Sequence, residues 1–167
     1  KIKIEEDALF MLAKFAEGGL RDAESALDQM SALAKDKITK EDVIQTLGFL
    51  EEERLVALMD AFIQRDAKSA VFLLHEVLNE GKDPMLFMEK LLEHTRNLLF
   101  MRVSEALGEF VDATESYKTA LSRQKESFSE EDLFYFFTVL SHTIQTMKRF
   151  EMKCIPIEMA LVKLAHR

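Results

Sequence analysis

The segment DPMLFMEKLLEHTRNLLFMRVSEALG, residues 83–108, contains no helix-breaking residue between Pro84 and Gly108. Asp83 followed by Pro84 puts an N-cap residue and a first-turn proline in the order in which helices begin. Apolar residues then recur at helical spacing. The segment therefore predicts a single helix of about 24 residues, roughly 36 Å long at 1.5 Å per residue.

The rest of the chain is also typical of helices. Glycine and proline are rare, with 5 and 2 in 167 residues, so the turn residues that an all-β fold needs are nearly absent. Helix starts are marked by Thr39 with Asp42, by Asp66, and by Ser129 with Asp132. We expect an all-α fold in which three short helices are followed by five or six longer ones.

The expected domain boundary lies near Gly48, between the short helices and the longer ones. It divides the chain into a small three-helix bundle, residues 1–48, and a larger bundle, residues 49–167. No low-complexity linker separates them. Because the sequence begins Lys1-Ile2 without an initiator methionine, we expect the chain to be part of a larger protein.

Charge and composition disfavour several classes of function. The formal net charge is −8 and the basic residues are not clustered, which argues against direct binding to nucleic acid. No apolar run reaches the ~18 residues of a membrane span. The single cysteine, Cys154, can form neither an internal disulfide nor a thiolate metal site. We expect it to be a small buried residue in a cytoplasmic protein.

Catalytic signatures are missing from the sequence. It has no G-x-x-x-x-G-K-[ST] phosphate loop, no G-x-G-x-x-G and no H-E-x-x-H zinc motif. A di-iron bundle would need a carboxylate three residues before a histidine, and no histidine here has one. We expect no catalytic residue and no metal site, and we assign surface or hydrogen-bonded core positions to His75, His94, His142 and His166.

One local pattern has the features of an anion site. The run GGLRD, residues 18–22, puts Arg21 in the first turn of a predicted helix, where a cation opposes the helix dipole at a cost of about 0.3–1 kcal/mol. Free N–H groups at the helix start, close approach at Gly18 and Gly19, and the guanidinium fork together suit a phosphate. The alternative is that Arg21 pairs with a carboxylate on a solvated face, from Glu17, Asp22 or Glu24.

Large apolar residues are concentrated in the larger bundle. The chain has 13 Phe and 9 Met, and the run LFYFF at residues 133–137 is apolar all round its predicted helix. Either this bundle has a thick core, or one face is buried against another subunit. A further apolar face is expected between Met85 and Leu99. We expect residues 49–167 to carry self-association and residues 1–48 not to.

The N-terminal residues also resemble a known family. Ala8-Leu9 and Leu12-Ala13, followed by AEGGLRDA at residues 16–23 and LDQ at residues 27–29, are similar to the lid domain of clamp-loader ATPases of the AAA+ class. The run ITKEDV, residues 38–43, fits the third lid helix. At Glu24 the family usually has leucine, a surface difference that leaves the Gly-Gly-x-Arg-Asp motif intact.

The later residues resemble the collar domain of the gamma/tau family of bacterial DNA polymerase III clamp-loader subunits. The matching segments are GKDP at residues 81–84, Phe87, and LLEHTRNLL at residues 91–99. The closing PIEMALVKL, residues 156–164, is similar to the final helix of that domain. The resemblance covers nearly the whole chain.

The resemblance implies an AAA+ lid at residues 1–48 and a collar at residues 49–167. Arg21 would be the sensor-2 arginine that contacts the terminal phosphate of ATP, with Gly18 and Gly19 beside it. The phosphate loop, Walker B acid, arginine finger and four-cysteine zinc module of the family's first domain are missing here. No ATPase activity and no cofactor are therefore expected for this chain, while the parent protein would use ATP with Mg²⁺.

The partners implied by the resemblance are the other clamp-loader subunits, which the collar would join in a ring. The intact complex would open a sliding clamp and load it onto primed DNA in the bacterial cytoplasm. The alternative interpretation is a free-standing helical oligomerisation or adaptor module without a link to a nucleotide. A phosphate loop about 150–200 residues upstream of Lys1 would favour the clamp loader.

Overall fold

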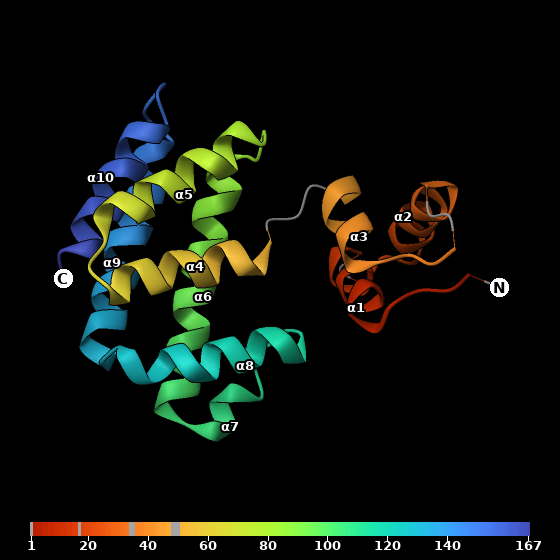
Figure 1. Cartoon of the computed structure of the whole chain (residues 1–167), viewed down its shortest axis with the longest axis horizontal. Helices are drawn as coiled ribbons and strands as arrows, with labels where there is room; N and C mark the ends of the chain where they lie inside the picture. Colours follow the sequence, from red (N-terminus) through yellow and green to blue (C-terminus); the bar gives the residue numbers. More distant parts are fainter. Residues whose placement is uncertain (1, 17, 34–35, 48–50) are drawn as a thin grey trace. The chain divides into compact units, whose positions relative to one another are not determined.

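The computed structural model describes residues 2–16, 18–33, 36–47 and 51–167, and these residues form helices and no named strand. The all-α prediction is confirmed. The chain divides into two compact units, Lys1–Glu51 and Glu52–Arg167 (Figure 1). The predicted junction at Gly48 lies outside the described residues. None of the described helices is both long enough and apolar enough to cross a membrane.

The first unit contains three helices, α1 (Glu6–Phe15), α2 (Leu20–Leu33) and α3 (Lys40–Leu47), each packed on the other two. A parallel β-bridge between Ile4 and Ile38 joins the segments that precede α1 and α3. The helices bury their apolar stripes against one another, as an amphipathic helix requires. The buried cluster consists of Ala8, Met11, Leu12, Ala26, Met30, Ile38, Val43 and Ile44.

The start of α3 is stabilised by the predicted capping box. The Thr39 backbone N–H donates to Asp42 Oδ2 at 2.9 Å, and the Asp42 N–H donates to Thr39 Oγ1 at 3.2 Å. The Thr39 hydroxyl also donates to Asp42 Oδ2, at 2.8 Å, and the two hydrogen bonds that Thr39 donates to this carboxylate lower the pKa of Asp42. Glu5 adds a long-range contact, because it accepts from Lys37 Nζ at 3.1 Å and from the Lys40 N–H at 3.2 Å.

The second unit is arranged around one long helix, α6 (Pro84–Val103), which packs on α4 (Glu52–Ile63), α7 (Glu105–Gly108), α8 (Glu115–Gln124) and α9 (Glu130–Met147). Figure 1 shows α6 running behind α4 and α8. The other helices, α5 (Ala67–Asn79) and α10 (Cys154–Ala165), pack on each other, and both contact α4. A short 3₁₀ turn, η1 (Lys125–Ser127), joins α8 to α9.

The long helix of the second unit ends earlier than the sequence predicts. Ser104 leaves the helical region, with φ −163° and ψ 140°, and its hydroxyl accepts from the Ala106 N–H at 3.2 Å. It thus ends α6 and caps the four-residue α7. Serine competes for backbone groups in this way more readily than longer side chains do. The predicted helix over residues 84–108 is therefore two helices, which gives seven α-helices in the described second unit instead of five or six.

The predicted helix starts in this unit are confirmed. Asp66 accepts from the Ser69 N–H, and Asp83 accepts from the Met85 and Leu86 N–H groups directly before Pro84. Ser129 and Asp132 form a reciprocal capping box on α9. Each cap joins residues two or three positions apart, so the sequence alone contains the whole interaction.

The two apolar faces that the sequence predicts differ in how far their side chains are buried. Phe87, Met88, Leu91 and Leu98 are buried, so α6 lies in the core and does not offer these residues to another subunit. The run at residues 133–137 is divided. Leu133 and Phe136 are buried, whereas Phe134 and Phe137 are 56% and 46% exposed. Phe136 makes edge-to-face contacts with Phe62 and Phe128, each at 5.4 Å between ring centroids.

Candidate functional site

Arg21 lies in the first turn of α2 and is exposed. Among the described residues its guanidinium has no hydrogen-bond or ion-pair partner, and neither Asp22 nor Glu24 pairs with it. Glu17, the third partner considered from the sequence, lies outside the described residues. The described carboxylates therefore leave the Arg21 guanidinium at the start of α2 unpaired.

The two glycines before Arg21 are required by the turn that starts α2. Gly18 has φ +85°, a conformation that side chains with a Cβ rarely adopt. A Cβ on Gly19 would lie 2.6 Å from Asp22 Oδ2 and 3.0 Å from the Ala16 carbonyl oxygen. The Asp22 carboxylate therefore lies against the positive end of α2. An anion that approaches here would meet this carboxylate, so the attraction would come from Arg21.

Of the surface and hydrogen-bonded core positions that the sequence left open for His94, the structure shows the second, in a polar network of the second unit. His94 on α6 is 0% exposed, its Nδ1 lies 2.5 Å from Tyr117 Oη, and its Nε2 lies 3.0 Å from Gln124 Oε1, both on α8. Gln124 Nε2 donates to the Val56 carbonyl at 2.8 Å and to Asp60 Oδ1 at 2.7 Å, both on α4. The network thus joins three helices.

The direction of every hydrogen bond in this network follows from its ends. The Val56 carbonyl and the Asp60 carboxylate can only accept, so they take both hydrogens of the Gln124 amide nitrogen. Gln124 Oε1 must then accept from His94 Nε2–H. Because a neutral imidazole has one N–H, His94 Nδ1 accepts from the Tyr117 hydroxyl.

Burial controls the titration of this network. It lowers the pKa of His94 to about 4, although the Gln124 hydrogen bond and the charges of Asp60 and Glu93 act in the opposite direction. Burial also raises the pKa of Tyr117, and the nearby Glu52 carboxylate adds to this effect. Both groups are therefore neutral at neutral pH, in agreement with the hydrogen-bond directions.

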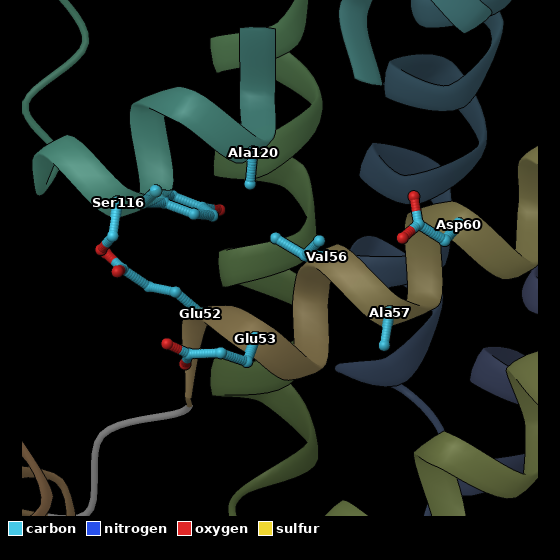
Figure 2. Close-up of a pocket in the computed structure, with 8 residues that line it drawn as sticks. Glu52, Glu53, Val56, Ala57, Asp60, Ser116 and Ala120 are labelled. Atoms are coloured by element: carbon cyan, nitrogen blue, oxygen red, sulfur yellow. The ribbon is translucent and has the colours of Figure 1, made fainter. Parts of the chain in front are cut away.

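A groove of about 360 Å³ lies between α4 and α8, beside the network. Figure 2 shows Glu52 and Ser116 pointing toward one another across it, with Val56 pointing from α4 toward α8. Thr114 Oγ1 donates to Glu52 Oε2 at 3.1 Å at one end, and Arg123 pairs with Asp60 at 2.8 Å at the other. The groove is lined by Glu52, Glu53, Val56, Ala57, Asp60, Ser116, Tyr117 and Ala120.

The remaining histidines and the cysteine do not form a site with one another. His142 and His166 are exposed, and the exposed His75 lies 2.9 Å from Glu158 through Nε2. Cys154 is a half-buried free thiol at the start of α10, not the fully buried residue expected. No group of His, Cys, Asp and Glu within the described ranges is arranged to hold a metal ion.

Two protein-family models match consecutive parts of the chain. Residues 1–36 match the family described as DNA polymerase III clamp loader subunit, ATPase lid domain. Residues 38–167 match the family described as DNA polymerase III subunits gamma and tau domain III. The two matches follow one another in the order expected from the sequence.

Individual relatives are similar to the chain at moderate identity. DNA polymerase III subunit tau of Bacillus subtilis is 26% identical over 98% of this chain and 29% of its own length. DNA polymerase III subunit gamma/tau of Mycoplasma genitalium is 35% identical over 59% of this chain and 17% of its own length. The chain therefore spans less than a third of either relative.

Among solved structures, the Bacillus subtilis DNA clamp loader delta protein is similar with a TM-score of 0.63 and 18% identity, over 99% of this chain and 52% of that one. This likeness supports the helical fold. The match over residues 38–167 covers most of the chain and shows the family directly. The chain belongs to the family of DNA polymerase III gamma and tau subunits.

Proposed function

We propose that the chain is the lid and collar part of a clamp-loader subunit. Residues 1–48 form the lid, which couples the ATP state of the parent protein to conformation, and residues 49–167 form the collar, which holds the subunits in a ring. The complete assembly opens a sliding clamp and places it on primed DNA in the cytoplasm. The main support is the succession of a lid match and a gamma and tau domain III match along one chain.

The proposed role of Arg21 is to contact the terminal phosphate of ATP, with Mg²⁺ and the other phosphate contacts supplied by the ATPase domain of the parent protein. Support comes from its exposed guanidinium without a partner among the described residues, at a turn that needs Gly18 and Gly19. A guanidinium can donate two parallel hydrogen bonds to a phosphate. The state of the phosphate would thereby be transmitted to α2 and the rest of the lid.

Substitution of Arg21 in the intact parent protein tests this role. We expect Arg21→Ala to impair ATP-dependent clamp loading, and Arg21→Lys to restore it only in part because lysine lacks the fork. Arg149→Ala, at an exposed arginine of the second unit, is the control and should load clamps normally. The lid itself should stay folded, since removal of a first-turn cation favours the helix by a few tenths of a kcal/mol.

Two results would contradict this assignment. A large fall in melting temperature with normal loading would make Arg21 a structural residue. Normal loading at unchanged stability would favour the free-standing adaptor.

The chain alone is expected to release no phosphate from ATP above the buffer background, because one arginine and one helix end cannot replace a phosphate loop.

The proposed collar contact lies on the second unit. Large apolar side chains are exposed on α9 and α10, including Phe134, Phe137 and Met159, the last 67% exposed. A groove of about 610 Å³ runs between these two helices. Large exposed apolar surfaces are rare on monomeric proteins and mark interaction sites. A ring would bury it in repeated head-to-tail contacts.

Sedimentation at high protein concentration tests the collar contact. We expect Met159→Glu on α10 to shift the full chain toward monomer, because a carboxylate would be buried at the interface. Leu9→Glu on α1, at a leucine that is 53% exposed in the first unit, is the matched control and should not change association. The reverse pattern would assign self-association to the lid.

A further inference from the structure

The packing of α8 against the rest of the second unit depends strongly on polar contacts. Its buried apolar residues are Tyr117 and Leu121, whereas α9 buries six apolar residues. At its start, Thr114 bonds Glu52 on α4. At its end, Gln124 and Arg123 both bond Asp60. A helix with few apolar anchors can open while the larger core stays folded.

His94 connects the two ends of this attachment. Tyr117 and Gln124 are seven residues apart, which places them on the same face of α8 two turns apart. The two ring nitrogens of His94 bond these two side chains, one acting as acceptor and the other as donor. The arrangement therefore requires a neutral imidazole protonated at Nε2.

We propose that His94 is a proton-sensitive latch: the neutral imidazole holds α8 against α4 and α6, and its protonation releases α8 and opens the groove between α4 and α8. With a proton on Nδ1, the imidazole would face the Tyr117 hydroxyl with a donor. The hydroxyl would have to turn its own hydrogen away and lose its acceptor. A positive charge would also be enclosed where water is excluded, and release of α8 would return it to solvent.

Burial, opposed by the surrounding charges, sets the pH range of the latch. Asp60 on α4 and Glu93 on α6 favour the protonated form, and Glu52, Glu53 and Glu93 act on Tyr117. Burial outweighs them and keeps the pKa of His94 near 4, below the ordinary value of 6.5. A histidine whose pKa is lowered in the closed state stabilises that state fully at pH values above its ordinary pKa of 6.5. The stabilisation is lost as the pH falls from 6.5 toward about 4, the pKa in the closed state.

Amide hydrogen exchange of the whole chain, corrected for the intrinsic pH dependence of exchange, tests the latch. Between about pH 7.5 and about pH 5, we expect the opening constant of α8 to rise about 30-fold, as one proton is taken up by a released imidazole. At about pH 5, α8 should open at least about 10-fold more readily than α9, which marks a local release.

Two variants separate the latch from general acid sensitivity. His94→Gln cannot take up the proton and should reduce the change to less than about 3-fold. His142→Gln, at an exposed histidine of α9, is the control and should keep the full change. Equal opening of α8 and α9 at every pH, or a full change in His94→Gln, would overturn the proposal.

Nitrogen NMR of the wild-type imidazole provides a test if His94→Gln does not fold. We expect the Nε2–H tautomer at neutral pH and a pKa near 4 for the folded chain. An Nδ1–H tautomer, or an ordinary pKa near 6.5 in the folded state, would equally overturn the latch.

Discussion

The two units of this chain use different kinds of interaction to hold their helices. In the first unit the described core is apolar, and its polar contacts, such as Thr39 with Asp42, are partly exposed at helix starts. The second unit also encloses polar groups, at His94, Thr95, Asn97, Thr114, Gln124 and Thr143. No polar side chain described in the first unit is buried. Thr95 and Thr143 donate to carbonyls of their own helices. His94 and Gln124 instead find partners on neighbouring helices, which the larger second unit can place around them.

Loss of core volume should produce the largest effect in the second unit. Phe136→Ala is expected to lower the free energy of unfolding by about 3–5 kcal/mol, because it leaves a cavity beside Phe62 and Phe128. Phe134→Ala, two positions earlier and exposed, should change it by less than about 0.5 kcal/mol. Urea unfolding, monitored by amide hydrogen exchange in α9, measures the free energy of unfolding of both variants. Similar losses would mean that the two sides of α9 are equally buried.

Loss of one buried hydrogen bond should produce a smaller effect. Tyr117→Phe is expected to cost about 1–3 kcal/mol, since it leaves His94 Nδ1 without a donor inside the core. The control is Tyr135→Phe, because no hydrogen bond of the Tyr135 hydroxyl is found among the described residues. Its unfolding midpoint in urea should match the wild type. An unchanged free energy of unfolding in Tyr117→Phe would show that this hydrogen bond adds nothing to stability.

Backbone conformation distinguishes Gly18 in the first unit from Gly108 in the second, because only Gly18 of this pair has a positive φ. Gly18→Ala in the first unit should cost about 1 kcal/mol, because alanine disfavours a positive φ. Gly108→Ala in the second unit should be neutral or stabilising by about 0.5 kcal/mol, since its Cβ would make only an ordinary contact, 3.7 Å from Met101 Cγ. Thermal unfolding of both variants checks this. Destabilisation by Gly108→Ala alone would reverse the comparison.

Mild acid should leave the first unit unchanged. It contains no histidine, and hydrogen bonds lower the pKa of its Glu5 and Asp42 carboxyls. A carboxyl group whose pKa is lowered by folding stabilises the folded state at pH values above its ordinary pKa, near 4. This stabilisation is lost only at lower pH. Amide exchange in α1, α2 and α3 should therefore give the same opening constants at about pH 7 and about pH 5. An acid-dependent rise there would show that the two units do not respond separately.

Local interactions explain which features could be predicted from the sequence. Asp66, Asp83 and the Ser129–Asp132 pair mark helix starts through contacts with residues two or three positions away. The run GGLRD likewise identified the turn before α2 and the exposed Arg21. Ser104 was missed because serine is tolerated inside helices, so its identity alone does not show that it ends α6.

Contacts between distant residues explain the rest. His94 meets partners 23 and 30 residues away, and Gln124 meets Asp60 across 64 residues, so no spacing in the sequence indicates the network. The run at residues 133–137 is apolar on every side, and only the helices packed around α9 separate the buried Phe136 from the exposed Phe134. Residue type and spacing determine where a helix begins and which family the chain resembles. Burial and hydrogen-bond partners depend on which elements meet after folding.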